Sequence, residues 1–173
     1  MKTLNIALVA HDARKEELVD WCTHNANWLS KHNLYGTGTT AKMLSAIPVL
    51  QDTSNLPEGT ITSAWYMMPL QVRPLLSGPL GGDQQIGAMI AEGKIDVLIF
   101  FCDNLITQGH QQDVGALARL ASLYNIAFAT NRTSADMLVT SPLLIDDNYE
   151  KIVPSVIENY NNRLVIIDNE KPS

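Results

Sequence analysis

Two short segments have residue types that suit the binding of a phosphate group. Thr37-Gly38-Thr39-Thr40 follows an apolar run at residues 34–36, and Ser77-Gly78 follows another at residues 72–76. Glycine lets the backbone approach a ligand closely, and hydroxyl and amide groups at a helix start donate hydrogen bonds to oxygen anions. Helix capping by Thr39 or Thr40 explains the first segment equally simply. Two such segments on neighbouring strands favour an anion site.

Asp83 is the candidate catalytic base. It follows Gly81-Gly82 and directly precedes an amphipathic helix. The two glycines remove bulk beside a carboxylate that could then reach a bound carbon acid. Because an acid in this place also suits a helix N-cap, capping is the competing interpretation. Asp113, just before the apolar positions of a later helix, has the same alternative.

His11 and Lys15 follow the first apolar run, at residues 4–10. His11 comes directly after a buried strand, where it could donate a hydrogen bond to a carbonyl or phosphate oxygen. Lys15 lies in the first turn of the next predicted helix and could add one compact positive charge to an anion site. A lysine on a helix is more commonly solvated, and this is the alternative.

The remaining histidines fall into two kinds. His110 lies in a loop between Asp103 and Asp113, so it has carboxylates on both sides in the sequence. His24 and His32 lie on or at the end of a predicted helix without a polar cluster around them. We expect both to be surface or packing residues.

The order of predicted elements indicates an α/β fold. Runs at residues 4–10, 96–101 and 126–130 are rich in Val, Ile, Leu and Phe, which is typical of strands covered on both faces. Helical periodicity separates them, with a helix of about five turns after the first strand. Thr133-Ser134-Ala135-Asp136 has the spacing of a capping box and predicts the start of another helix. The alternation predicts a doubly wound, mainly parallel sheet with helices on both faces, whose strands end at one ligand-binding edge.

One domain is predicted over residues 1–165, followed by a tail at residues 166–173. Residues 48–74 lack sustained periodicity and are expected to form an extended loop, an insertion or an irregular hairpin. A further amphipathic helix is expected around residues 155–164.

Composition excludes several classes of protein. The chain has 173 residues with 12 Lys or Arg and 18 Asp or Glu, a net charge of −6, and 46% apolar residues. An acidic chain is unsuited to nucleic acids and to anionic membranes, so any anion must be bound locally. No apolar stretch approaches the roughly 18 residues of a membrane span, and no signal peptide is evident, so a cytoplasmic protein is expected. Cys22 and Cys102 lie in apolar segments and are expected in the core, and no metal cluster or nucleophile elbow appears.

Several segments together resemble the methylglyoxal synthase family. The most specific is Ser77-Gly78-Pro79-Leu80-Gly81-Gly82-Asp83-Gln84-Gln85. The other matching positions are Ile6–Asp12, Thr37–Thr40, Ile95–Phe101, His110, Asp113, Arg119 and Asn131. The likeness extends from Asn5 to about Arg163.

The resemblance implies a lyase that needs neither metal nor cofactor and converts dihydroxyacetone phosphate into methylglyoxal and inorganic phosphate. Asp83 matches the general base, and His110 matches an imidazole that contacts the carbonyl and hydroxyl oxygens. Asp113 matches a further catalytic or supporting position. The implied substrate and phosphate contacts are His11, Lys15, Thr37, Gly38, Thr39, Thr40, Ser77 and Gly78, and the implied supporting residues are Asp12, Asp103 and Arg163.

The resemblance also implies a homo-oligomer, commonly a hexamer, with phosphate as product and allosteric inhibitor. The sequence departs from the family at residues 104–109, where two expected prolines are missing, and at residues 51–72, which are longer than usual. The first departure motivates an alternative, a regulatory domain of the same fold that binds a phosphate ligand with weak or no catalysis.

Overall fold

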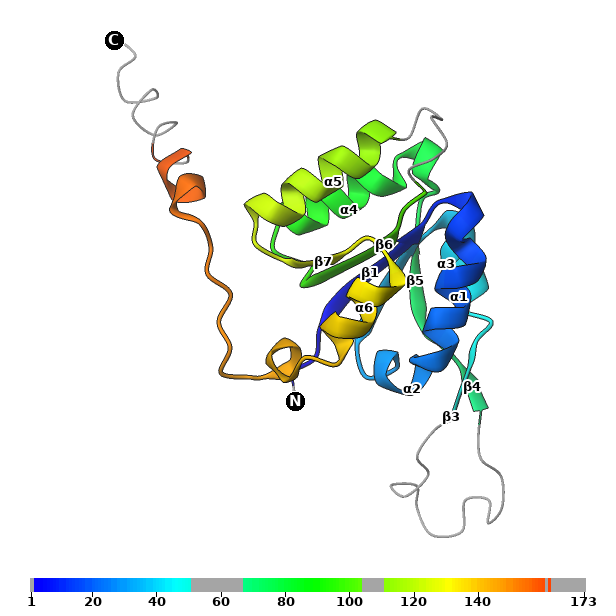
Figure 1. The fold of residues 1–173 in the computed structure, drawn as a ribbon. Coiled ribbons are helices and arrows are strands. Elements are labelled where there is room, and N and C mark those ends of the chain that lie inside the picture. Colours follow the sequence, from blue (N-terminus) through cyan, green and yellow to red (C-terminus); the bar gives the residue numbers. More distant parts are fainter. Residues whose placement is uncertain (1, 51–66, 104–110, 161, 163–173) are drawn as a thin grey trace.

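Five parallel strands form the central sheet of the computed structural model, which describes residues 2–50, 67–103, 111–160 and 162 (Figure 1). The strand order is β5-β2-β1-β6-β7. Their bounds are β1 (Asn5–Ala10), β2 (Asn33–Thr37), β5 (Val72–Leu75), β6 (Val97–Phe101) and β7 (Ala127–Ala129). The strand order therefore reverses between β1 and β6, the place where sheets of this kind bind ligands.

Helices cover both faces of the sheet (Figure 1). The helices on one face are α1 (Lys15–His24), α2 (Ala26–Leu29), α3 (Gly38–Leu44) and α6 (Arg132–Val139). The helices on the other face are α4 (Gly82–Ala91) and α5 (Gln111–Leu123). Alternate residues of β1 serve the two faces, since Ile6 and Leu8 pack in one core cluster while Ala7 and Val9 pack in the other. The predicted α/β fold is confirmed.

The expectation of a single five-turn helix after β1 is wrong. The chain instead forms a 3-10 helix, η1 (Asp12–Arg14), then α1, then the short α2. The break is at Asn25, whose side-chain Nδ2 donates to the Trp21 carbonyl at 2.9 Å. Asparagine competes in this way for the carbonyls that would continue a helix, so the two helical pieces are separate.

The expected capping box at Thr133 is also wrong. α6 begins at Arg132, and its N-cap is Asn131, whose side-chain oxygen accepts from the Ser134 amide at 3.0 Å. Asparagine is among the best N-cap residues, so it takes the position two residues earlier than the threonine.

The ends of residues 48–74 are strands, so the expectation of an extended loop is wrong there. β3 (Pro48–Leu50) and β4 (Met67–Pro69) form an antiparallel pair, which is the hairpin alternative, and residues 72–74 belong to β5 of the main sheet. Val49 and Leu70 are buried, and the Leu70 amide donates to the Ile47 carbonyl at 2.8 Å. Residues 51–66 lie outside the described part of the chain.

After the 3-10 helix η3 (Pro142–Ile145) the chain leaves the body as an arm, residues 146–160, ending in a helix at residues 155–160 (Figure 1). The far end of the helix expected to residue 164 lies outside the described residues. No helix in the described part of the chain has the length and apolar character needed to cross a membrane.

Both cysteines are core residues, as predicted. Burial raises the pKa of the Cys22 thiol, and it raises that of Cys102 to about 11, with Arg14 opposing the shift. Neither thiol is activated as a nucleophile.

Candidate active site

Thr37–Thr40 and Ser77-Gly78, the two phosphate-type segments, lie against each other at the carboxyl ends of β2 and β5. Thr37 is paired with Leu75 in the parallel ladder, so the residues that follow both strands emerge side by side. Gly38 has φ +33°, and a Cβ built on it would lie only 2.7 Å from the Ser77 Cβ. No larger residue fits between the segments, so glycine permits this contact.

Capping by Thr39 or Thr40 is not what the structure shows. α3 begins at Gly38 and the N-cap position is Thr37, which makes no side-chain capping bond. Thr39 and Thr40 lie within the first turn of the helix, the former exposed and the latter buried.

Asp83 lies in the first turn of α4, where 7% of the residue is exposed. The N-cap interpretation is wrong for it, because the N-cap is Gly81 with φ 100°. The Gly82 amide donates to the Ser77 carbonyl at 3.0 Å, and a Cβ built on Gly82 would lie 2.0 Å from the Leu76 oxygen. The two glycines therefore allow the start of α4, whose first turn carries Asp83, to pack directly on the end of β5.

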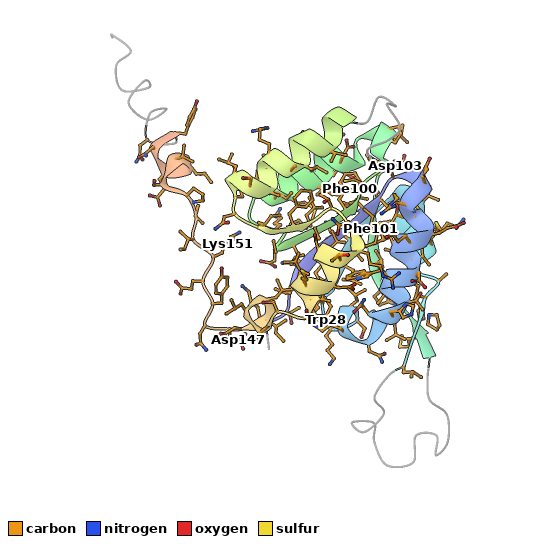
Figure 2. All side chains as sticks on the ribbon, in the orientation of Figure 1. Trp28, Phe100, Phe101, Asp103, Asp147 and Lys151 are labelled. Atoms are coloured by element: carbon orange, nitrogen blue, oxygen red, sulfur yellow. The ribbon has the colours of Figure 1, made fainter. Side chains whose placement is uncertain are left out.

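His11 lies at the strand-order reversal between β1 and β6. Its Nδ1 accepts a hydrogen bond from the Asp103 amide at 2.7 Å, and its ring forms a T-shaped pair with the Phe100 ring, with centroids 5.1 Å apart. Figure 2 shows Phe100 in the core and Asp103 at the carboxyl edge of the sheet. Because Nδ1 is the acceptor, the proton of the neutral ring is on Nε2. That Nε2 is buried and has no hydrogen-bond partner in the described ranges, so His11 has a donor left for a ligand.

Lys15 is not the solvated lysine of the alternative interpretation. It is the first residue of α1, and 20% of its side chain is exposed. Its Nζ lies 2.6 Å from Asp12 Oδ1, whose side chain is 96% exposed. The positive charge of this partly buried side chain is thus paired with an exposed carboxylate at the end of β1.

The side chains of three predicted site residues are not described by the structure. His110 and Arg163 lie outside the described residues. Asp113 is the third residue of α5, which begins at Gln111. The N-cap interpretation is therefore wrong for it too. Nothing is described of its side chain. The other predicted site residues all follow the carboxyl ends of the strands, and they are His11, Asp12, Lys15, Thr37, Gly38, Thr39, Thr40, Ser77, Gly78, Asp83 and Asp103.

A separate groove of about 240 Å³ runs between α4 and α5. It is lined by Asp83, Gln84, Gly87, Ala88, Ala116, Leu117 and Leu120. Asp83 borders it, but none of the phosphate-type residues does. The polar donors converge at the strand ends, and we place the candidate site there rather than in the groove.

A glutamine for which the sequence predicts no role also contacts the end of β5. Gln85, on the same helix as Asp83, accepts a hydrogen bond through Oε1 from the Leu76 amide at 2.8 Å. The sequence shows the glutamine but not that its side chain reaches back to the strand. In the described part of the chain, no three His, Cys, Asp or Glu residues are placed to hold a metal ion.

Comparisons with known proteins agree on one family. The model of the MGS-like domain matches residues 67–130. The methylglyoxal synthase of Leptospira interrogans is 45% identical over 92% of this chain and 90% of its own length, and that of Pseudoalteromonas atlantica is 49% identical over 86% and 96%. The crystal structure of methylglyoxal synthase from Elizabethkingia anophelis superposes with a TM-score of 0.66 at 37% identity, covering 88% of this chain and 93% of that one. The chain belongs to the methylglyoxal synthase family.

Proposed function

We propose that this protein converts dihydroxyacetone phosphate into methylglyoxal and inorganic phosphate, with Asp83 as the general base. The observation that carries the assignment of the base is the close packing of three segments. Gly38 approaches Ser77, and Gly82 packs on Leu76, so the helix turn that carries the buried Asp83 packs against the two segments that suit a phosphate. A regulatory domain that only binds a ligand would have no use for a buried acid in this place.

The first step of the proposed mechanism is proton removal. Asp83 takes a proton from the substrate carbon that bears the hydroxyl group, and the electron pair of that C–H bond forms an enediolate. A proton next to a ketone is a very weak acid, so donors must stabilise the new charge on oxygen. The Nε2–H of His11 and, by the family resemblance, His110 are the groups we assign to those oxygens.

The second step expels the phosphate. The hydroxyl oxygen of the enediolate loses its proton and forms the aldehyde C=O, the pair of the old C=C bond moves to form a C=C bond to the phosphate-bearing carbon, and the C–O bond to phosphate breaks, with the phosphate leaving with that bonding pair. Lys15 and the hydroxyl and amide groups of Thr37–Thr40 and Ser77-Gly78 are assigned to the charge that grows on it. The remaining enol takes up a proton on carbon and loses one from oxygen to give methylglyoxal.

A direct assay tests the activity. Purified full-length protein in buffer with EDTA is given dihydroxyacetone phosphate, and methylglyoxal and phosphate are measured together. We expect the two products in equal amounts, with no requirement for added metal. Folded protein that releases neither product would contradict the proposed function.

A homo-oligomer, expected to be a hexamer, is also proposed. In support, the arm at residues 146–160 exposes large apolar side chains away from the body, among them Ile152 at 79% and Tyr160 at 64%. Contiguous exposed apolar surface is typical of association sites. Sedimentation that gives the mass of one chain would contradict this part.

We further propose a cytoplasmic enzyme with one domain over residues 1–165, inhibited by inorganic phosphate. The released phosphate suits the same donors as the substrate, and in an oligomer its binding to one subunit can alter the others. The test is to measure the rate as a function of substrate concentration at several phosphate concentrations. We expect phosphate to make the dependence of rate on substrate concentration sigmoidal. Rates that do not change with phosphate would contradict the proposal.

A further inference from the structure

One side-chain hydrogen bond closes the segment that carries both the proposed base and a phosphate-type pair. The Leu76 amide donates to Gln85 Oε1 at 2.8 Å. The register of β5 with β2 ends one residue earlier, at the Thr37–Leu75 pair. Gln85 therefore supplies an acceptor at the point where the pairing of the sheet stops.

The segment between the two bonded residues contains Ser77, Gly78 and Asp83. Backbone bonds hold its middle, since the Gly81 amide donates to Gly78 at 2.9 Å and the Gly82 amide donates to Ser77 at 3.0 Å. The bond from Leu76 to Gln85 lies outside these and joins the end of β5 to the first turns of α4. It therefore bears directly on the distance between the strand end and the helix that carries the acid.

We propose that Gln85 is a positioning residue, which fixes the separation of the Ser77-Gly78 pair from the Asp83 carboxylate by holding Leu76 through Oε1. The inference rests on the proposed function of this site. Gln85 does not itself touch substrate; it is exposed, and it acts through the backbone of residue 76.

Because Gln85 is exposed, losing its hydrogen bond to Leu76 affects stability and catalysis differently. Water can replace an exposed acceptor, so losing the bond has little effect on stability. Catalysis is more sensitive, because a misplacement of about 1 Å between reacting groups lowers the rate about 100-fold. A positioning role therefore predicts a loss of turnover without a matching loss of stability.

The chain offers a matched control in Gln84. It is the same residue type, adjacent on the same helix and also exposed, but it does not accept from Leu76. Gln85→Met keeps the length of the side chain and removes the acceptor oxygen, and Gln84→Met makes the same chemical change without touching that bond. We expect Gln85→Met to lower kcat by about 10- to 100-fold and to weaken phosphoglycolate binding. Gln84→Met should leave both near the wild-type values, and the two variants should have the same thermal midpoint.

A third variant tests whether the acceptor itself matters. Gln85→Glu keeps an oxygen at the same distance along the side chain and should recover most of the lost kcat. Its negative charge should raise KM at low salt by repelling the substrate phosphate, and this effect should shrink as the ionic strength rises. A variant as slow as Gln85→Met at all salt concentrations would contradict the proposal.

Hydrogen exchange of the Leu76 amide separates failure of this inference from failure of the proposed function. The inference predicts faster exchange at Leu76 in Gln85→Met than in Gln84→Met, whether or not the protein turns over substrate. Equal exchange and equal phosphoglycolate binding in the two variants would overturn it. A kcat loss matched by a lower thermal midpoint would also overturn it, because the effect would then be one of folding.

Discussion

The two ends of the central sheet each hold a histidine that accepts a main-chain amide proton on Nδ1. His11, at the carboxyl end, accepts from Asp103 at 2.7 Å, and His32, at the amino end, accepts from Leu4 at 3.3 Å. Figure 2 places Asp103 and Trp28 at opposite ends of the sheet, and the His32 ring packs on Trp28 with centroids 4.3 Å apart. The same contact thus occurs in two different surroundings.

The surroundings differ in how the polar groups are used. At the amino end, the Asp96 carboxylate accepts from the amide and the side chain of Asn5, and Asn5 accepts from Asn33 at 3.0 Å. These three side chains hold one another, although His32 Nε2, like His11 Nε2, is buried without a hydrogen-bond partner among the described residues. At the carboxyl end, Gly38 and Gly82 bring backbone segments together around hydroxyls, amides and a buried acid. We infer that the amino end stabilises the fold and the carboxyl end carries the chemistry.

Of the glycine substitutions, Gly82→Ala should have the largest effect on the carboxyl end. The new Cβ would lie 2.0 Å from the Leu76 oxygen, so the backbone must move and Asp83 must move with it. We expect kcat to fall about 100-fold or more and the free energy of unfolding to fall by about 1–3 kcal/mol. Phosphate release and urea unfolding measure the two quantities.

The control for this change is Gly115→Ala on α5, where a Cβ meets nothing within 4 Å. Helix propensity predicts unchanged or slightly raised stability there. A Gly82→Ala variant as active as this control would show that the close approach to Leu76 is not needed.

Gly38→Ala should have the next largest effect, on binding of the phosphate group. The residue has φ +33° and no space beside Ser77, so alanine strains the backbone and separates the two segments. Gly115→Ala is again the control, because a Cβ there meets nothing within 4 Å and the residue lies outside the two phosphate-type segments. We expect roughly tenfold weaker phosphoglycolate binding, about 1.4 kcal/mol, for Gly38→Ala alone, measured by calorimetry. Equal losses in both variants would count against the contact.

Asp96→Ala should affect only stability. It removes the acceptor for both donors of Asn5, and each such bond is worth about 1 kcal/mol. We expect the free energy of unfolding to fall by about 1–2 kcal/mol, with kcat and KM unchanged. A large loss of kcat in folded Asp96→Ala would break the division between the two ends.

The smallest predicted effect is the pH dependence contributed by His32. Burial, and then the nearby charge of Lys31, lower its pKa below the usual value of 6.5. The unfolded chain therefore takes up the proton more readily, so this contribution to stability is present above about pH 6.5 and is lost as pH falls below it. His32→Gln should make the loss of stability below that pH shallower, as measured by urea unfolding at a series of pH values. An unchanged slope in His32→Gln would contradict this assignment.

The sequence predicted most of the sheet because the apolar runs of β1, β6 and β7 leave few alternatives to buried parallel strands. It missed the helix boundaries where one asparagine side chain decides the outcome, as Asn25 does by bonding to Trp21 and Asn131 by capping α6. Such bonds depend on geometry within one turn, and the residue types alone also permit a continued helix or a cap at Thr133.

The candidate site was predicted unevenly for a similar reason. The residues after the strands could be chosen because parallel strands end at one edge. The distance between the segments could not be, since it depends on Gly38 and Gly82 meeting particular backbone atoms. The link from Gln85 to Leu76 connects residues nine apart across a turn, and no periodicity predicts it.

Two carboxylates at opposite ends of the sheet provide the most direct test. Phosphate release and phosphoglycolate binding are measured for Asp83→Asn and Asp96→Asn beside the wild-type protein. We predict that Asp83→Asn loses at least about 10³-fold in kcat while still binding phosphoglycolate, and that Asp96→Asn turns over at the wild-type rate. Near-normal turnover by Asp83→Asn would contradict the central claim that chemistry at the carboxyl end depends on this acid.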